Sequence, residues 1–387
     1  MHLPPELTDI VIDHLYGDQH SLSACALTCR EWLPTVRYHR FHHTSLPVSR
    51  DSTQRFHEVL LASPEICILV QSLELHGPVG SAEVHTWENA SYTFLTLLPA
   101  VARLKLVAVI LEDSVQGMLV TSLRGVTQLA MYRCRYRSFQ SLVTLIGSFP
   151  SLHTLSLSFG IKWRFHFPLP ASVASDLRSH LPAGLRTLRL GEPRSEDHAR
   201  SSEIVTVREM LMLEIHTKRT VHVAQQLLNA LSSDTLEALE LDVGGTNGLL
   251  RSIEREGFTL APCTRLRTCM LRVLLRYSPS HNNDPDVRGF VTLLATLASP
   301  LLKTLTLSLY IQDAEDSSTA RRVRFDELQA FDWASIGAML GPTRLPALQK
   351  LLVEGTGEMA VLEDYIRHVL PALYARRVVQ LVPYTRR

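Results

Sequence analysis

Two cysteines and three histidines near the start of the chain could in principle bind zinc. Cys25 and Cys29 are four residues apart, and His39, His42 and His43 follow them closely. Thiolate sulfur and imidazole nitrogen are the ligands that tetrahedral zinc takes. Both cysteines, however, lie on the apolar stripe of a predicted helix, where small buried thiols are common. We therefore predict that the chain holds no metal and no other cofactor.

A second group of residues has the composition of a nucleic-acid contact. The run from Tyr132 to Arg137 alternates tyrosine with arginine, and such mixtures stack on bases and meet phosphates. The same run also fits the end of a strand and the turn after it, because Cys134 follows Met131 by three residues. The net charge of +1 gives the chain no basic field, so we predict no nucleic-acid partner.

Motifs of enzymes are missing from the sequence. The loop Gly244–Gly248 is rich in glycine, but it lacks the Gly-Lys-Ser/Thr of a phosphate cradle and is interpreted as a turn. The sequence contains no Gly-x-Ser-x-Gly, His-Glu-x-x-His or Asp-Phe-Gly motif. We predict that the protein is not an enzyme and has no catalytic residues.

Leucine dominates the composition and recurs at fixed spacing. The chain has 65 leucines among 387 residues, and from residue 70 onward the unit apolar-x-x-apolar-x-apolar repeats. Within a unit, the fourth and sixth positions fall on one face of a strand. Predicted helices separate some of the units, at Phe139–Phe149, Val223–Leu231 and Val287–Ala298. The units begin at Val70, Val101, Val126, Leu152, Leu185, Met210, Leu236, Leu266, Leu302 and Leu348.

Strand and helix alternating at a period near 28 residues resemble leucine-rich repeats. Cys134 matches the Asn/Cys position of that consensus. The resemblance implies an α/β fold, an irregular solenoid whose curved, largely parallel sheet carries helices on its convex side. The register near 204–216 stays ambiguous, because a unit starting at Val207 fits almost as well. A doubly wound α/β domain is the alternative, which the fixed spacing disfavours.

Polar loops and a C-terminal cap complete the predicted solenoid. Three segments rich in polar, Pro, Asn or Ser residues are interpreted as insertions: Glu192–Ser202, Ser278–Asp286 and Asp313–Thr319. A helix from Met359 to Leu373 and a strand at Val378–Val382 are expected to cover the final repeat, within a cap at 348–387.

The first 45 residues follow a different, helical pattern. Leu7, Ile10, Val11 and Leu15 share one stripe of a predicted helix over Glu6–Leu15. A turn at Gly17-Asp18 and a second amphipathic run from Leu22 to Val36 follow, and Pro34 must interrupt that run. Such short helices cannot bury much surface, so we expect this segment to need a partner.

The same segment resembles the F-box. The matching pattern is Leu3-Pro4-x-Glu6-Leu7, an aspartate-marked turn, and Cys29-Arg30-x-Trp32. The resemblance implies docking to the Skp-type adaptor of a Skp–cullin–F-box ubiquitin ligase. It divides the chain into an adaptor-binding segment at 1–45, a linking helix at 46–69 and a solenoid at 70–387. The residues that match adaptor-contact or supporting positions are Leu3, Pro4, Leu7, Ile10, Leu22, Leu27, Cys29 and Trp32.

An F-box followed by leucine-rich repeats implies the substrate receptor of a ligase, in which the repeats bind an unidentified target protein. Alternatives are a binding scaffold without a ligase, an enzyme whose site no motif reveals, and an RNA-binding protein. Residues that alternate with the buried leucines are expected on the concave sheet face, with basic residues first and acidic residues later. Such residues could also merely keep an exposed sheet soluble. The candidates for target binding are Glu74, Arg103, Lys105, Arg189, Glu214, Glu240 and Asp242.

The sequence also suggests where the protein resides. The N-terminus lacks a basic region followed by an apolar one, so we expect no signal peptide. The most apolar stretch, Leu97–Leu111, contains Arg103 and Lys105 and is too short for a membrane span. Six cysteines are too few for a disulfide scaffold. A cytoplasmic or nuclear location, without a membrane partner, is the expectation.

Overall fold

The described chain is mixed α/β and forms two compact units. A computed structural model describes residues 5–77, 92–157, 162–163, 180–190, 221–222, 224–231, 235–242, 257–277, 288–313, 328, 331–355 and 359–383. The first unit comprises Met1–His153 with Lys162–Phe167, and the second comprises Thr154–Ile161 with Pro168–Arg387. Eleven parallel strands make up the main sheet. Within the described part of the chain, no helix has the length and apolar character needed to cross a membrane.

Three short helices open the first unit, as predicted. They are α1 (Pro5–Asp13), α2 (Gln19–Thr28) and α3 (Leu33–Phe41), with a 3-10 turn at Arg30–Trp32. Asp18 caps α2, because its carboxylate accepts hydrogen bonds from the backbone N–H groups of His20 and Ser21, each at 3.1 Å. The predicted break at Pro34 is confirmed, since this proline lies in the first turn of α3, where no intrahelical N–H is required.

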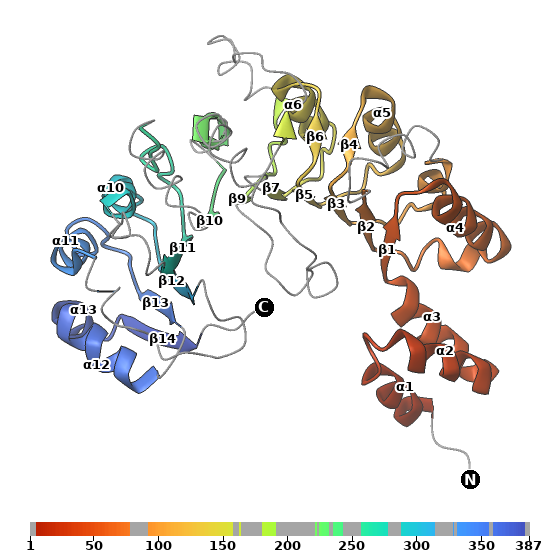
Figure 1. Cartoon of the computed structure of the whole chain (residues 1–387), viewed down its shortest axis with the longest axis horizontal. Helices are drawn as coiled ribbons and strands as arrows, with labels where there is room; N and C mark the ends of the chain where they lie inside the picture. The colour runs from red at the N-terminus through yellow and green to blue at the C-terminus, as the bar shows by residue number, and fades with distance from the viewer. Residues whose placement is uncertain are drawn as a thin grey trace. The chain divides into compact units, whose positions relative to one another are not determined.

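The main sheet of the first unit contains four parallel strands in the order β1, β2, β3 and β5. Figure 1 shows helices α4, α5 and α6 on one side of these strands. A smaller parallel sheet, β4-β6-β8, follows the strand ends. The strands are β1 (His43–Pro47), β2 (Ser72–His76), β3 (Arg103–Val107), β4 (Ile110–Leu111), β5 (Gln128–Tyr132), β6 (Arg135–Tyr136) and β8 (Lys162–Trp163); the helices are α4 (Arg50–Ala62), α5 (Asp113–Ser122) and α6 (Phe139–Gly147), with 3-10 turns η2 (Pro64–Ile66) and η4 (Thr93–Leu97).

Strand β1 was not predicted. It crosses the predicted boundary at residue 45 and pairs in parallel with β2, so that Thr44 lies opposite Leu73 and Leu46 opposite Leu75. The segment lacks the apolar-x-x-apolar-x-apolar spacing, because a threonine takes the place of the first strand leucine. The sheet therefore begins one strand earlier than Val70. The predicted linking helix exists as α4, but it connects two strands of the same sheet.

The second unit continues the alternation of strand and helix. Its strands, all parallel, follow the order β7, β9, β10, β11, β12, β13 and β14, and Figure 1 shows α10 to α13 on one side of β11 to β14. Residues 221–222 and 224–231 are also helical. The elements are β7 (Thr154–Leu157), β9 (Thr187–Leu190), β10 (Ala238–Asp242), β11 (Thr268–Tyr277), α10 (Arg288–Thr296), β12 (Thr304–Asp313), α11 (Trp333–Met339), β13 (Lys350–Gly355), α12 (Met359–Val369), α13 (Pro371–Ala375) and β14 (Val379–Pro383).

Nine of the ten predicted units contain a strand at the predicted place, and β14 confirms the C-terminal strand. The unit at Met210 lies outside the described residues. Strands β9 and β10 pair directly, with Leu188 opposite Leu239. The predicted last helix is interrupted at Leu370, because Pro371 begins the separate helix α13.

Buried leucines align across the strands and form the core. The fourth and sixth residues of the nine described units are buried, and the parallel register brings equivalent residues opposite one another. Burying a leucine side chain contributes about 1.5–3 kcal/mol to the stability of the fold. Each of the nine strands adds two such core positions. The first unit has the rows Leu73-Leu104-Leu129 and Leu75-Leu106-Met131; the second has Leu155-Leu188-Leu239-Cys269-Leu305-Leu351 and Leu157-Leu190-Leu241-Leu271-Leu307-Val353.

Two strand exits have the same left-handed turn. Ala108 after β3 and Arg133 after β5 have φ angles of 55° and 54°. Cys134 then enters the core, where its thiol donates to the carbonyl of Leu106 at 3.4 Å, and burial raises its pKa to about 12. Tyr136 is fully buried as well. The interpretation of Tyr132–Arg137 as a strand exit is confirmed, and Tyr136 offers no exposed ring for a base.

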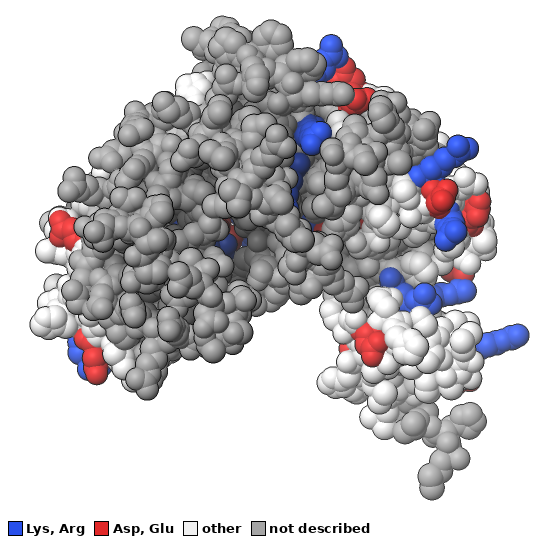
Figure 2. All heavy atoms as spheres, in the orientation of Figure 1, with Lys and Arg blue, Asp and Glu red and all other residues white. Residues whose placement is uncertain are grey.

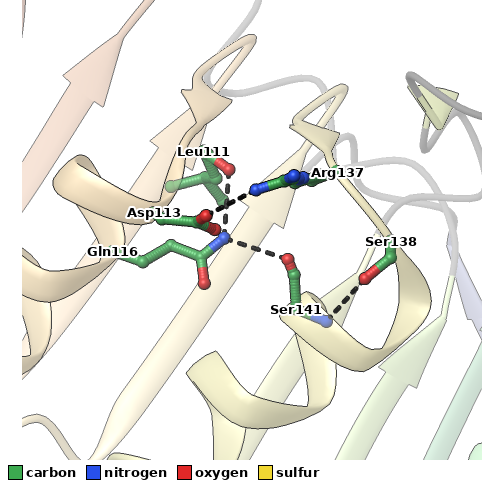
Figure 3. A network of polar contacts seen from close by, with 6 residues as sticks. All are labelled: Leu111, Asp113, Gln116, Arg137, Ser138 and Ser141. Carbon is green, nitrogen blue, oxygen red and sulfur yellow. Dashed lines mark hydrogen bonds and ion pairs between the residues drawn. The ribbon is translucent and has the colours of Figure 1, made fainter.

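A polar network joins the helices α5 and α6 at their N-terminal ends (Figure 3). The buried amide of Gln116 donates to the carbonyl of Leu111 at 3.0 Å and to the hydroxyl of Ser141 at 3.3 Å. Ser138 caps α6 by accepting from the Ser141 N–H at 3.1 Å. Gln116 of α5 thus provides a donor for the carbonyl at the end of β4, and its bond to Ser141 links α5 to α6.

We expect Gln116→Ala to lower the free energy of unfolding of the first unit by about 1–3 kcal/mol, because the Leu111 carbonyl loses its donor. The matched control is Gln140→Ala, an exposed glutamine in α6 whose replacement should change stability by less than about 0.5 kcal/mol. Urea denaturation of both variants measures the difference. Equal stabilities would show that the network contributes nothing.

Candidate interaction surfaces

Helix α1 presents an apolar face to solvent. Leu7, Ile10 and Val11 are each about half exposed, whereas Ile12 is buried. Thr8 is also buried. Of the predicted stripe of Leu7, Ile10, Val11 and Leu15, the first three residues face solvent and Leu15 packs against the core of the segment. The helix instead buries the Thr8–Ile12 side, which leaves three aliphatic side chains at i, i+3 and i+4 without cover from the described residues.

The helical segment has a small core of its own. Ile12, Leu22 and Val36 from the three helices are fully buried and in contact. Leu15, Cys25, Ala26 and Trp32 pack against them and are partly buried. Leu22 and Trp32, both predicted to contact or support an adaptor, thus stabilise the segment. Cys25 belongs to this core, and among the described residues no group of three or more His, Cys, Asp or Glu side chains is placed to hold a metal ion.

The other predicted adaptor residues differ in exposure. Leu27, at the end of α2, is 89% exposed, and Cys29 is partly buried between α2 and the 3-10 turn. Leu3 and Pro4 lie outside the described residues. The exposed aromatic ring of Tyr16, after α1, was not predicted. Hydrophobic periodicity could not identify it, since Tyr16 lies in the turn between two helices.

Polar contacts fix α1 on α3, so its apolar face is held in a defined orientation. The Thr35 hydroxyl donates to Asp9 at 2.5 Å, and the His39 Nε2 lies 2.6 Å from Asp13 Oδ1. Figure 2 shows that the described surface of the helical segment, at the lower right, is mostly uncharged on the face in view. An exposed aliphatic face that is held in a defined orientation is suited to binding a protein.

The sheet face opposite the leucines carries paired charges in the first unit. Glu74 lies opposite Lys105 in the register, with 2.9 Å between carboxylate and ammonium, and His76 contacts the same carboxylate at 3.0 Å. Burial raises the pKa of Glu74, but hydrogen bonds from His76 and Lys105 outweigh it and leave the pKa below the usual value. The Lys105 ammonium also lies over the ring of Tyr132, 5.7 Å from its centroid.

The second unit repeats this pairing. Arg189 lies 3.2 Å from Glu240, and Arg272 lies 3.2 Å from Asp242, in each case across neighbouring strands. The expected segregation into a basic first half and an acidic middle is therefore wrong for these residues, because the parallel register brings opposite charges together. Glu214 lies outside the described residues. Sequence spacing alone could not show the pairing, since it depends on which strands are neighbours.

No protein-family model matches this chain, and no curated protein matches its sequence. Inference about function therefore depends on the two surfaces. One is the apolar face of the helical segment, and the other is the polar sheet face with its paired charges.

The two ion pairs on β10 are expected to differ in energy. The side chains of Arg272 and Asp242 are 14% and 17% exposed, whereas those of Arg189 and Glu240 are 51% and 34% exposed. Asp242→Ala should destabilise the second unit by about 2 kcal/mol, because it leaves a largely buried guanidinium without its carboxylate. Glu240→Ala on the same strand should cost less than about 1 kcal/mol.

Chemical denaturation of the two single variants, and of double-mutant cycles with Arg272→Ala and Arg189→Ala, measures both couplings. The sheet-face description would be contradicted if the Arg189–Glu240 coupling were the larger of the two.

Proposed function

We propose that the protein is the substrate receptor of a Skp–cullin–F-box ubiquitin ligase. In this proposal the helical segment is an F-box that docks a Skp-type adaptor, and through it a cullin. The strands that follow form a leucine-rich-repeat solenoid that holds a target protein. The observation that carries the proposal is the exposed aliphatic face of α1 on a segment whose own core is only three residues deep.

The geometry of α1 supports a helical partner. Leu7, Ile10 and Val11 form a ridge at i, i+3 and i+4, the spacing by which an amphipathic helix inserts into an apolar groove. Their partial exposure leaves apolar surface that burial against a partner would stabilise. Leu27 adds an aliphatic side chain from α2 that contributes little to the core of the segment. Three of these residues, Leu7, Ile10 and Leu27, are among the positions that the F-box resemblance assigns to the adaptor or its support.

The strands support a leucine-rich-repeat interpretation. Parallel neighbours, paired buried leucines in each strand, and a buried cysteine after a left-handed turn are features that the repeat consensus implies. The polar face of such a sheet is a surface on which repeat proteins bind extended partners. The receptor would perform no chemistry itself. It would raise the effective concentration of the target near the ubiquitin-carrying enzyme.

The adaptor interface can be tested with charge substitutions on exposed residues. Ile10→Asp and Leu27→Asp should each weaken binding of a purified Skp-type adaptor at least tenfold, because a carboxylate would be buried at an apolar interface. The matched control is Leu61→Asp, at an exposed leucine of α4, which should bind as the unchanged protein does. These variants are preferable to changes at Trp32, which packs against the core.

Calorimetric titration gives the affinities, and circular dichroism shows whether each variant remains folded. A truncated chain that begins at His42 provides a second test, since the cut falls after α3 and keeps β1 intact. Adaptor binding by the truncated chain, or unchanged affinity of both aspartate variants, would refute the F-box. A scaffold without a ligase would then be the better interpretation.

Target binding can be tested on the sheet face. Glu240→Lys should reduce capture of target proteins from cell extract and leave adaptor binding unchanged, because it places a lysine opposite Arg189 and reverses the local charge. Glu58→Lys on α4 is the control for charge reversal elsewhere. Quantitative mass spectrometry compares the captured proteins, and identical sets from all three proteins would exclude this part of the sheet as the target surface.

A further inference from the structure

Five aromatic rings form a closed circuit where the helical segment meets the sheet. The ring pairs have centroid separations between 4.6 and 6.1 Å, and each ring contacts two others. Three of the five rings are imidazoles, which titrate near neutral pH. In order around the circuit, the residues are Tyr16, His39, Tyr38, His42 and His43.

His42 is the residue at which the helical segment ends and the sheet begins. Its backbone N–H donates to the Tyr38 carbonyl at 2.8 Å and so closes the last turn of α3. Its carbonyl accepts from the N–H of Ser72 at 3.0 Å and from that of Gln71 at 3.3 Å, at the start of β2. The next residue, His43, is the first of β1. Movement at His42 would therefore change how the three helices α1, α2 and α3 are attached to the sheet.

A side chain of the sheet contacts the His42 imidazole in only one of its protonation states. The Arg103 guanidinium, on β3, lies 3.3 Å from His42 Nε2. A guanidinium only donates, so Nε2 must be unprotonated to accept this hydrogen bond, and the proton of the neutral ring is then on Nδ1. The Nδ1 atom is buried and has no hydrogen-bond partner. A second proton on this ring would break the bond to Arg103 and place two cations in contact.

We propose that the ring circuit is a pH-sensitive joint, closed while His42 is neutral and loosened when acid protonates it. The inference concerns the attachment of the helical segment and goes beyond adaptor binding, because it would hold whatever partner the segment has. Its consequence is that acid would free the exposed face of α1 to change its orientation relative to the sheet of the first unit.

The charges around the circuit give the direction of the effect. Burial, with Arg103 and His39 nearby, lowers the pKa of His42, and burial with Arg103 and His42 lowers that of His43, although its ring remains partly exposed. Because the pKa is lower in the closed state than in an open, solvated one, the open state binds more protons. The stability of the joint is therefore complete above the ordinary histidine pKa and falls as the pH decreases through it.

The remaining charged groups at the circuit limit the loosening by acid to the connection between α3 and the sheet. Asp13, on α1, lies 2.6 Å from the His39 imidazole, so this ring faces a carboxylate and the contact between α1 and α3 does not oppose a positive charge. His42 and His43 instead face Arg103. Acid should thus loosen the connection between α3 and the sheet while the three helices stay together.

Hydrogen exchange of the full chain, without adaptor, tests the joint. After correction for the intrinsic effect of pH, the amides of residues 42–46, of Val48 and of Ser72 should exchange roughly threefold or more faster at pH 5.5 than at pH 7.5. The amides of α1 and α2 should show no such increase. The joint and adaptor binding are separate hypotheses. A negative result for one would therefore leave the other unchanged.

Three variants make the result specific to His42. His42→Gln keeps an acceptor for Arg103 and cannot titrate, so exchange should lose most of its dependence on pH, the remainder coming from His43; His42→Lys carries a permanent charge and should exchange fast at both values. The control is His57→Gln, on α4, outside the circuit, which should behave as the unchanged protein does. The joint is refuted if exchange of the unchanged protein does not depend on pH, or if His42→Gln retains the full dependence.

Discussion

The nine strands β2, β3, β5, β7 and β9 to β13 each bury two core residues against neighbouring strands. Parallel strands in register place leucine opposite leucine across a row, so the rows are continuous only while each strand supplies an apolar side chain at both positions. The same register fixes everything on the opposite face. A residue between the two leucines is held beside its equivalents on the adjacent strands, whatever its charge. The core therefore determines which polar side chains meet.

This constraint explains why the sheet face carries ion pairs. Glu74 with Lys105, and Asp242 with Arg272, occupy equivalent positions of neighbouring strands. A protein bound to this face would have to replace some of these pairs or recognise them as they are. Charge complementarity then favours specificity over affinity, because every broken pair offsets part of the gain from a new one. A receptor that releases its target after modification would benefit from such a surface.

Most of the sheet could be predicted from the sequence, and the exceptions have physical causes. Strict three-then-two spacing identified nine strands, since burial of both leucines leaves few alternatives. It missed β1, where Thr44 replaces a leucine and caps α3 through its hydroxyl. It identified the apolar stripe of α1 but could not show that Leu7, Ile10 and Val11 face solvent, because they are as apolar as the residues that the helix buries. Periodicity shows that an apolar stripe exists, but neighbouring elements decide whether it faces the core.

The unpredicted strand β1 and the exposed apolar face of α1 have a common structural consequence. The core of Ile12, Leu22 and Val36 is small, and α1 leaves its most apolar face outside that core. The orientation of the segment relative to the sheet of the first unit depends on one connection, which consists of α3, His42 and β1. Strand β1 makes this connection through its backbone, and backbone pairing does not require a leucine at each core position. For this reason the leucine spacing predicted no strand there. The helical segment is thus attached to the sheet through β1, a strand that the leucine spacing does not reveal. This attachment leaves the apolar face of α1 available to a partner and also orients that face.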